Sequence, residues 1–185
     1  HLQRRRQRQM CIRDSSRSLT LIFPLPATQK YYRSRPLNML GFLVGHEGKG
    51  SLLSLLKEEG LASGLSAGGG DSTSSYTSFN INIQLTPKGL KRYTKVIERT
   101  FQYLRLLREK SLPRYVYEEV RRMAEIDYRF AEKTGGTRLV NMFSLLMQIY
   151  PLRSVERAPF LISEYRPRLF DSMLFRLCLL YTSPS

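Results

Sequence analysis

The chain has 185 residues, of which 42% are hydrophobic, and it carries a formal net charge of +15 at pH 7. No apolar run is long enough to cross a membrane as a helix, and the length suits one domain with a sizeable core. Both cysteines, Cys11 and Cys178, lie near the ends, so the body of the chain has no thiol for a disulfide, a metal cage or a nucleophile.

The two ends of the chain are predicted to be non-native. Residues 178–183 can be encoded by TGTCTCTTATACACATCT, and the reverse complement of that DNA word, read from its third base, encodes residues 10–14. This resembles translated sequencing-library adapter; the alternative is a basic arm and an apolar tail that match by coincidence. We therefore exclude residues 1–15 and 178–185 from fold prediction and expect them to pack poorly. The first fifteen residues hold five arginines and one aspartate, a net +4, which leaves +11 on the body, residues 16–177.

Three strands are predicted in the first half of the body. Residues 19–23 form a short apolar run with β-branched members, closed by the sequence Pro-Leu-Pro. Residues 61–67 form a possible second strand, which leads into a glycine-rich loop at residues 68–71. The clearest strand covers residues 79–85, where apolar and polar side chains alternate with the period of a strand that has one buried face.

Helices are predicted between and after these strands. A helical pair flanks the segment VGHEGKG at residues 44–50, because leucines recur at helical spacing on both sides. Thr86 and Pro87 supply an N-cap and a first helical residue for a long amphipathic helix that runs to about Lys110. Later helices are expected from Pro113 to a break at residues 135–136, over residues 139–150, and, as two short pieces separated at Pro167, over residues 156–177. Strands first and helices afterwards predict an α+β fold, with an antiparallel sheet packed on one face by helices.

The segment VGHEGKG resembles a metal site or a phosphate loop at first sight. His46 and Glu47 begin neither H-E-x-x-H nor H-x-x-E-H, because no second histidine follows and the only other one is His1. A phosphate loop needs a lysine directly after its last glycine, where this chain has Ser51. The segment is therefore predicted to be a turn between two helices, with His46 as a polar side chain that covers the junction.

The basic body raises nucleic-acid binding as a hypothesis. Its positive charges are spread among acids, however, since the predicted helices mix Glu98, Glu118 and Glu125 with their lysines and arginines. No helix-turn-helix pattern and no RNA-binding aromatic strand signature accompanies them. Solvated helix faces are the favoured interpretation, so no nucleic-acid partner is expected.

Several motifs in one collinear order resemble those of a known family. They span about residues 19–177 and read TLIFPLPATQKYYRSRP, GHEGKGSLLSLLKEEG, FNINIQLTPKGL, FQYLRLLRE, QIYPL and EYRP. On these motifs the chain resembles the insulinase family, the insulysin and nardilysin branch of the inverzincin zinc metallopeptidases. The resemblance implies a large peptidase of four related α+β domains that enclose a chamber for peptides, with the zinc motif in the first domain. Residues 16–177 resemble part of the second domain, which carries no zinc ligand.

By the same resemblance, a peptide is anchored on a strand edge remote from the zinc. An extended peptide can pair its main chain with such an edge, and small side chains allow close approach. Glu47 is a candidate partner for the ammonium group of the peptide, with a capping role as the alternative. The family often has two adjacent glycines where this chain has Ala67 and Gly68, so the alignment can shift by a residue. Matched position by position, the junction and the anchoring strand of the family correspond to His46, Glu47 and Gly48, and to Leu65, Ser66, Ala67 and Gly68.

We therefore expect a fragment of a zinc metalloendopeptidase that contributes a non-catalytic domain for enclosing and anchoring peptides. Zinc would be bound in the parent enzyme and not by this chain, which is expected to be inactive alone. The expected partners are peptide substrates and the other domains of the parent enzyme, without nucleic acid or membrane. The residues do not specify the compartment, for which the cytoplasm is expected. The alternative is a stand-alone peptide-binding or scaffold protein of the same fold, and a basic nucleic-acid binder comes third.

Overall fold

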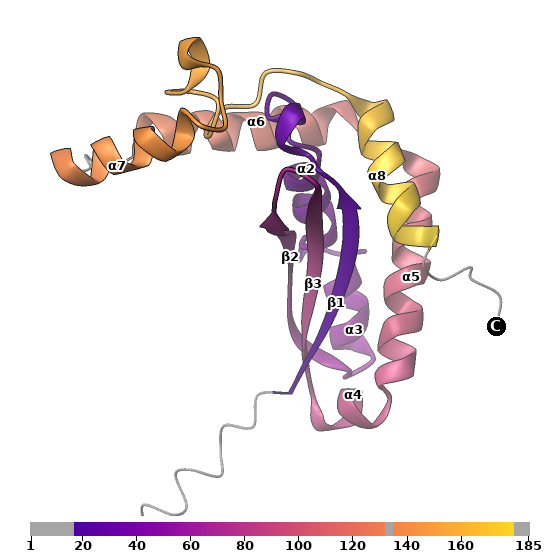
Figure 1. The fold of residues 1–185 in the computed structure, drawn as a ribbon. Helices are drawn as coiled ribbons and strands as arrows, with labels where there is room; N and C mark the ends of the chain where they lie inside the picture. Colours follow the sequence, from indigo (N-terminus) through magenta and orange to yellow (C-terminus); the bar gives the residue numbers. More distant parts are fainter. Residues whose placement is uncertain (1–16, 132–134, 180–185) are drawn as a thin grey trace, which may run out of the picture.

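The computed structural model describes residues 17–131 and 135–179, which form an antiparallel sheet with helices against one of its faces (Figure 1). The described sheet has the strand order β1–β3–β2, formed by Ser18–Pro26, Tyr76–Leu85 and Ala62–Ser72. β1 pairs with β3 in continuous register, whereas β2 pairs with β3 through two register shifts, one at each end of the ladder. This arrangement confirms the predicted α+β fold.

The strand β3 has one buried and one exposed face, as its alternating sequence predicted. The side chains of Phe79, Ile81 and Ile83 are fully buried. Asn82 points to the opposite face and is exposed, and Ile22 of β1 is 64% exposed on that same face. None of the described helices covers this outer face of the sheet.

The helical pair predicted around residues 44–50 is formed by α2 (Pro36–Val44) and α3 (Leu52–Glu58). The start of α3 is capped, because the hydroxyl of Ser51 accepts a hydrogen bond from the backbone N–H of Ser54 at 3.1 Å. Residues 45–51 form bends and turns between the two helices, as predicted. Both helices pack against β2.

The long helix predicted after Thr86 is in fact two helices, α4 (Pro87–Lys91) and α5 (Tyr93–Lys110), which meet at the non-helical Arg92. Thr86 caps α4 as predicted, since its hydroxyl accepts from the backbone N–H of Gly89 at 3.0 Å. Gly89 packs so tightly on the backbone carbonyl of Leu61 that a side chain at this position would collide with it. This contact directs α4 independently of α5, so a tertiary contact overrides the continuous helical pattern.

Downstream, the described residues form α6 (Arg114–Arg129), α7 (Gly136–Leu146) and α8 (Pro167–Leu179). α8 packs against α5 and α2, whereas α7 lies away from the sheet (Figure 1). The first of the two short helices predicted over residues 156–177 is absent, because residues 155–160 form turns. Pro159 explains the difference, since a proline disfavours the helical conformation of the residue before it. Gly136, where a break was predicted, is the first residue of α7. Short 3-10 turns cover Gln29–Tyr31 and Leu152–Ser154.

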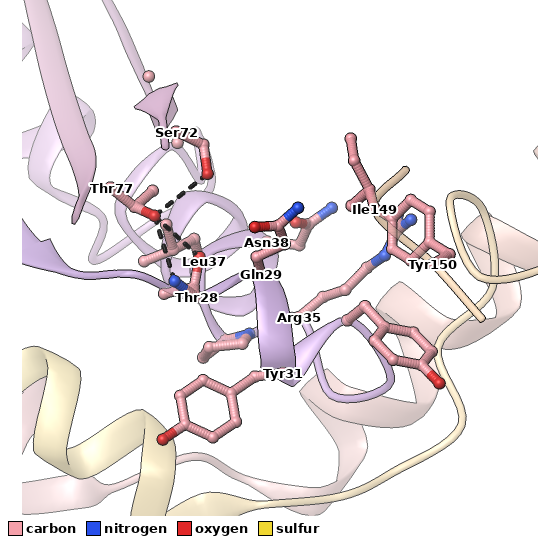
Figure 2. Close-up of a pocket in the computed structure, with 14 residues that line it drawn as sticks. Thr28, Gln29, Tyr31, Arg35, Leu37, Asn38, Ser72, Thr77, Ile149 and Tyr150 are labelled. Carbon is pink, nitrogen blue, oxygen red and sulfur yellow. Dashed lines mark hydrogen bonds between the residues drawn. The ribbon is translucent and has the colours of Figure 1, made fainter. Parts of the chain in front are cut away.

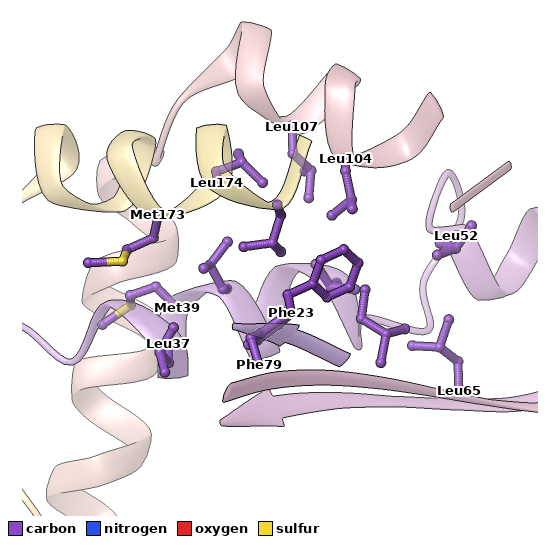
Figure 3. Close-up of a cluster of buried hydrophobic side chains, with 14 of the residues drawn as sticks. Phe23, Leu37, Met39, Leu52, Leu65, Phe79, Leu104, Leu107, Met173 and Leu174 are labelled. Carbon is purple, nitrogen blue, oxygen red and sulfur yellow. The ribbon is translucent and has the colours of Figure 1, made fainter. Parts of the chain in front are cut away.

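The hydrophobic core lies between the inner face of the sheet and the helices (Figure 3). Phe23 of β1 and Phe79 of β3 meet Leu104 of α5 and Leu174 of α8 in this layer, and each is at most 2% exposed. Burial of such a side chain contributes roughly 1.5–3 kcal/mol to folding. The core therefore draws on both the first and the last described elements.

Cys178 belongs to one of the two predicted non-native ends, yet it packs against the core. It follows Leu174 by one helical turn in α8, is half-buried, and has the pKa of its thiol raised by that burial. The expectation of poor packing is therefore wrong for Cys178. Apart from Leu179 at the end of α8, the rest of segments 1–15 and 178–185 lies outside the described residues, and their non-native origin stays a prediction. In the described part of the chain, no helix has the length and apolar character needed to span a bilayer.

Candidate functional site

The candidate site is the outer edge of β2. Within the described residues, β2 pairs with β3 and with no other strand. Leu65 is buried in the core, Ser66 is exposed, and Ala67 and Gly68 are partly exposed. Leu65 can therefore meet a ligand only through its main chain, whereas the small side chains after it leave the backbone accessible.

The direction of the backbone groups on this edge follows from two hydrogen bonds at the ends of the ladders. The N–H of Leu85 donates to the carbonyl of Arg17, beside β1, at 2.7 Å. The N–H of Thr86 donates to the carbonyl of Leu61, beside β2, at 3.1 Å. Because the bonding direction alternates along an antiparallel strand, odd-numbered residues of β3 bond to β1 and even-numbered residues bond to β2.

Three residues of β2 consequently turn their N–H and C=O groups away from the sheet. Leu65, Ala67 and Gly69 lie opposite odd-numbered residues of β3, which are already bonded to β1. Their backbone groups face the free edge, where the main chain of an added strand could reach them. Ser66 and Gly68 lie opposite even-numbered residues and face β3.

The helix α2 flanks this edge at very short range. A Cβ atom on Gly41 would lie 2.9 Å from the carbonyl oxygen of Ala67, and one on Gly45 would lie 3.7 Å from its nitrogen. The two glycines are one helical turn apart, so they present a strip without side chains to the strand. These two glycines were not among the predicted site residues, although two glycines four residues apart in a helical pattern are a detectable signal of close packing.

The junction residues predicted to belong to the site follow directly after this strip. His46 is exposed, and its imidazole folds back over Gly48, where a Cβ atom would collide with it. The carboxylate of Glu47 is 68% exposed and lies 4.0 Å from the ammonium group of Lys57 in α3. The structure therefore brings the junction beside Ala67 through Gly45, but it shows no contact between the side chain of Glu47 and β2. The predicted role of Glu47 toward an ammonium group stays a prediction.

A cavity of about 350 Å³ opens where the edge of β2 ends (Figure 2). Gly69, Gly70 and Ser72 form its β2 wall, and the start of α2 and the residues before it form the opposite wall. The hydroxyl of Thr77 connects the two walls, because it lies 3.2 Å from the hydroxyl of Ser72 and accepts from the backbone N–H of Thr28 at 3.2 Å. The cavity is therefore continuous with the strand edge, a feature that sequence reasoning did not predict.

The described residues include no group of three or more histidine, cysteine, aspartate or glutamate side chains that could hold a metal ion. The chemistry available at the edge of β2 is hydrogen bonding by backbone groups, and a positive charge lies in the cavity beside it. This combination suits the binding of an extended chain.

A family model described as the peptidase M16 inactive domain matches residues 2–123. Among curated proteins, the insulin-degrading enzyme of Drosophila melanogaster is 37% identical over 161 residues, which cover 87% of this chain and 16% of that protein. Human nardilysin is 34% identical over 164 residues, which cover 86% of this chain and 14% of that protein. The chain thus spans about a sixth of the length of these relatives.

Solved structures share the fold. The crystal structure of pitrilysin superimposes with a TM-score of 0.81 at 25% identity, over 86% of this chain and 17% of that one. The inactive peptidase domain of a putative zinc protease from Bordetella parapertussis superimposes with a TM-score of 0.66 at 16% identity, over 88% of this chain and 84% of that one.

Proposed function

The chain belongs to the peptidase M16 inactive-domain family, and we propose that it is the part of a zinc metalloendopeptidase that encloses and anchors peptides without cleaving them. The relatives named insulin-degrading enzyme and nardilysin confirm the resemblance to the insulysin and nardilysin branch. Because the chain covers only a small share of either relative, the activity of the whole protein is part of the proposal.

The difference between the two edges of the described sheet carries the proposal. On β1, Pro24 and Pro26 lie opposite even-numbered residues of β3, so the outward positions that they occupy have no N–H to offer. On β2, the outward positions at Leu65, Ala67 and Gly69 all keep their N–H groups, and small residues surround them. A peptide can add as a strand to β2, where main-chain bonds provide affinity without demanding a particular sequence.

Zinc belongs to another domain of the parent enzyme in this proposal. An open catalytic zinc site needs three protein ligands and a water held near a base. This chain would contribute the main-chain hydrogen bonds that orient a long peptide and keep it near the chamber, so its effect is on binding and positioning.

The proposal predicts that Ala67→Pro weakens peptide binding by the full chain about 10-fold, because it removes an outward N–H and places a ring on the edge. The bond ladder between β2 and β3 should survive, since the N–H of Ala67 faces away from β3. Fluorescence anisotropy with a labelled extended peptide measures the dissociation constant, with and without a chelator. We expect the chelator to change nothing.

Ile22→Pro is the matched control. Ile22 lies on the other edge of the sheet, opposite an even-numbered residue of β3, so the substitution removes an equivalent outward N–H from β1. Binding should be unchanged in this variant. If Ala67→Pro binds peptide as tightly as the unaltered chain while both melt alike, or if both proline variants lose binding equally, the edge of β2 is not the anchor.

A further inference from the structure

The cavity at the end of β2 contains an isolated positive charge. Its other lining side chains are uncharged, so Arg35 is the only charged residue among those that line it. The guanidinium extends along the cavity toward Tyr150 (Figure 2). The other residues that line the cavity are uncharged and include the amide side chains of Gln29 and Asn38.

Arg35 lacks an acidic partner. Its Nη2 donates to the backbone carbonyl of Ala158 at 2.9 Å, and the described residues give it no ion pair. Burial lowers the pKa of the guanidinium, which stays protonated because an arginine in a protein keeps its charge. A partly buried cation with donors to spare is costly unless an anion compensates it.

The backbone also holds Arg35 in an unusual conformation. Its φ of 41° and ψ of 62° lie in the left-handed region, which non-glycine residues rarely adopt. Three backbone hydrogen bonds hold it there. Its N–H donates to the carbonyl of Tyr31 at 2.9 Å, and its carbonyl accepts from the backbone N–H groups of Asn38 and Met39 at 3.0 and 3.4 Å. Such strain persists where the surroundings over-determine it, and it is concentrated at binding sites.

The position of the cavity along β2 indicates what would enter it. Gly69 is both the last outward-facing residue of the regular ladder and part of the cavity wall. A peptide paired along Leu65, Ala67 and Gly69 therefore reaches the cavity with its next residues. Arginine binds a carboxylate through two parallel hydrogen bonds. The start of α2, which follows Arg35 on the wall opposite Gly69, adds a favourable dipole for an anion.

We infer that this cavity is a subsite for a carboxylate of the peptide anchored on β2, with Arg35 as the binding residue. The inference rests on the proposed function and adds a preference to it: among peptides of similar length, those with a carboxylate just beyond the anchored stretch bind best. The carboxylate belongs to a glutamate or aspartate side chain, or to the C-terminus of the peptide.

The test measures binding of the full chain to a series of labelled peptides by anisotropy. In amidated peptides, a single glutamate is moved along the sequence one position at a time, with glutamine at the same position as the reference. A second set has a free C-terminal carboxylate, no acidic side chain, and stepwise changes in length. One set or the other should show a position at which the carboxylate tightens binding about 10-fold.

Arg35→Gln should abolish that gain and leave the glutamine peptides unaffected. Arg33→Gln is the matched control. Arg33 is exposed and lies outside the cavity, and its substitution changes the net charge by the same amount. A general effect of the +15 charge would respond equally to both substitutions. Thermal melting of each variant establishes that it is folded.

The outcomes separate the subsite from the anchor. If peptides bind in a manner sensitive to Ala67→Pro but no position responds to Arg35→Gln more than to Arg33→Gln, the subsite is wrong and the anchor stands. If none of the peptides binds, both proposals fall. If the gain appears at one position and depends on Arg35, the subsite is established, and the set that shows it identifies the kind of carboxylate.

Discussion

Gly41 determines how closely α2 can lie against the edge of β2. A Cβ atom at this position would be 2.9 Å from the backbone oxygen of Ala67, and backbone cannot move aside as a side chain can. We expect Gly41→Ala to lower the free energy of unfolding by about 1–3 kcal/mol, although alanine favours a helix over glycine by about 1 kcal/mol. Gly136→Ala in α7 is the control, since no described atom beyond its chain neighbours and the backbone of its own helix lies within 4 Å of the added methyl group. This substitution should be neutral or stabilising. Urea denaturation measures both, and equal effects would contradict the proposed close approach.

At the scale of elements, Glu59 links α3 to α5. Its carboxylate accepts from Nε and Nη2 of Arg99 at 3.0 and 2.7 Å and lies 3.1 Å from Nζ of Lys95. The bonds from Arg99, with a smaller effect of Lys95, hold the pKa of Glu59 below its usual value. A carboxyl group whose pKa is lowered by folding stabilises the protein above its unfolded pKa, and this contribution is lost as the pH falls through the folded pKa.

Glu59→Gln should therefore destabilise the chain at neutral pH, and the difference from the unaltered chain should shrink as the pH falls below about 4. Urea denaturation at several pH values measures the difference. Glu109→Gln is the control: Glu109 is exposed on α5, the helix that Glu59 contacts, and its substitution should have a small effect at every pH. A deficit in Glu59→Gln that persists undiminished in acid would mean that packing, and not the charge, links the two helices.

At the scale of the whole molecule, α6 and α7 carry apolar side chains into solvent. Met123, Ile126 and Phe130 form one stripe on α6 and are 39%, 56% and 75% exposed. An exposed stripe of this kind binds apolar dyes and lowers solubility. We expect the double substitution Ile126→Ser with Phe130→Ser to reduce the fluorescence of bound 8-anilinonaphthalene-1-sulfonate at least about twofold. The double substitution Asp127→Ser with Arg129→Ser changes the same helix without changing the net charge, and it should leave the dye fluorescence unaltered. An equal decrease of fluorescence in the two double variants would mean that the dye does not bind to the apolar stripe.

Several features of the fold could be predicted because local chemistry controls them. The alternation in β3, the cap formed by Thr86, and the turn between α2 and α3 depend on residues a few positions apart. The break at Arg92 could not be predicted from local sequence. It depends on the close contact between Gly89 of α4 and the backbone of Leu61, a residue far away in sequence. The motif resemblance located the strand and junction of the candidate site, but its residue-level assignments remain predictions.

The sequence by itself determined the α+β class, the membership of the family and the small residues of β2. Only the tertiary structure decided which of those residues turn their backbone groups outward, since that depends on pairing with β3. It also brought Gly41 against Ala67 and attached Arg35 to Ala158, 123 positions later in the chain. Periodicity and capping act within one or two turns of chain, whereas an edge, a close approach and a cavity exist only after distant segments have packed together.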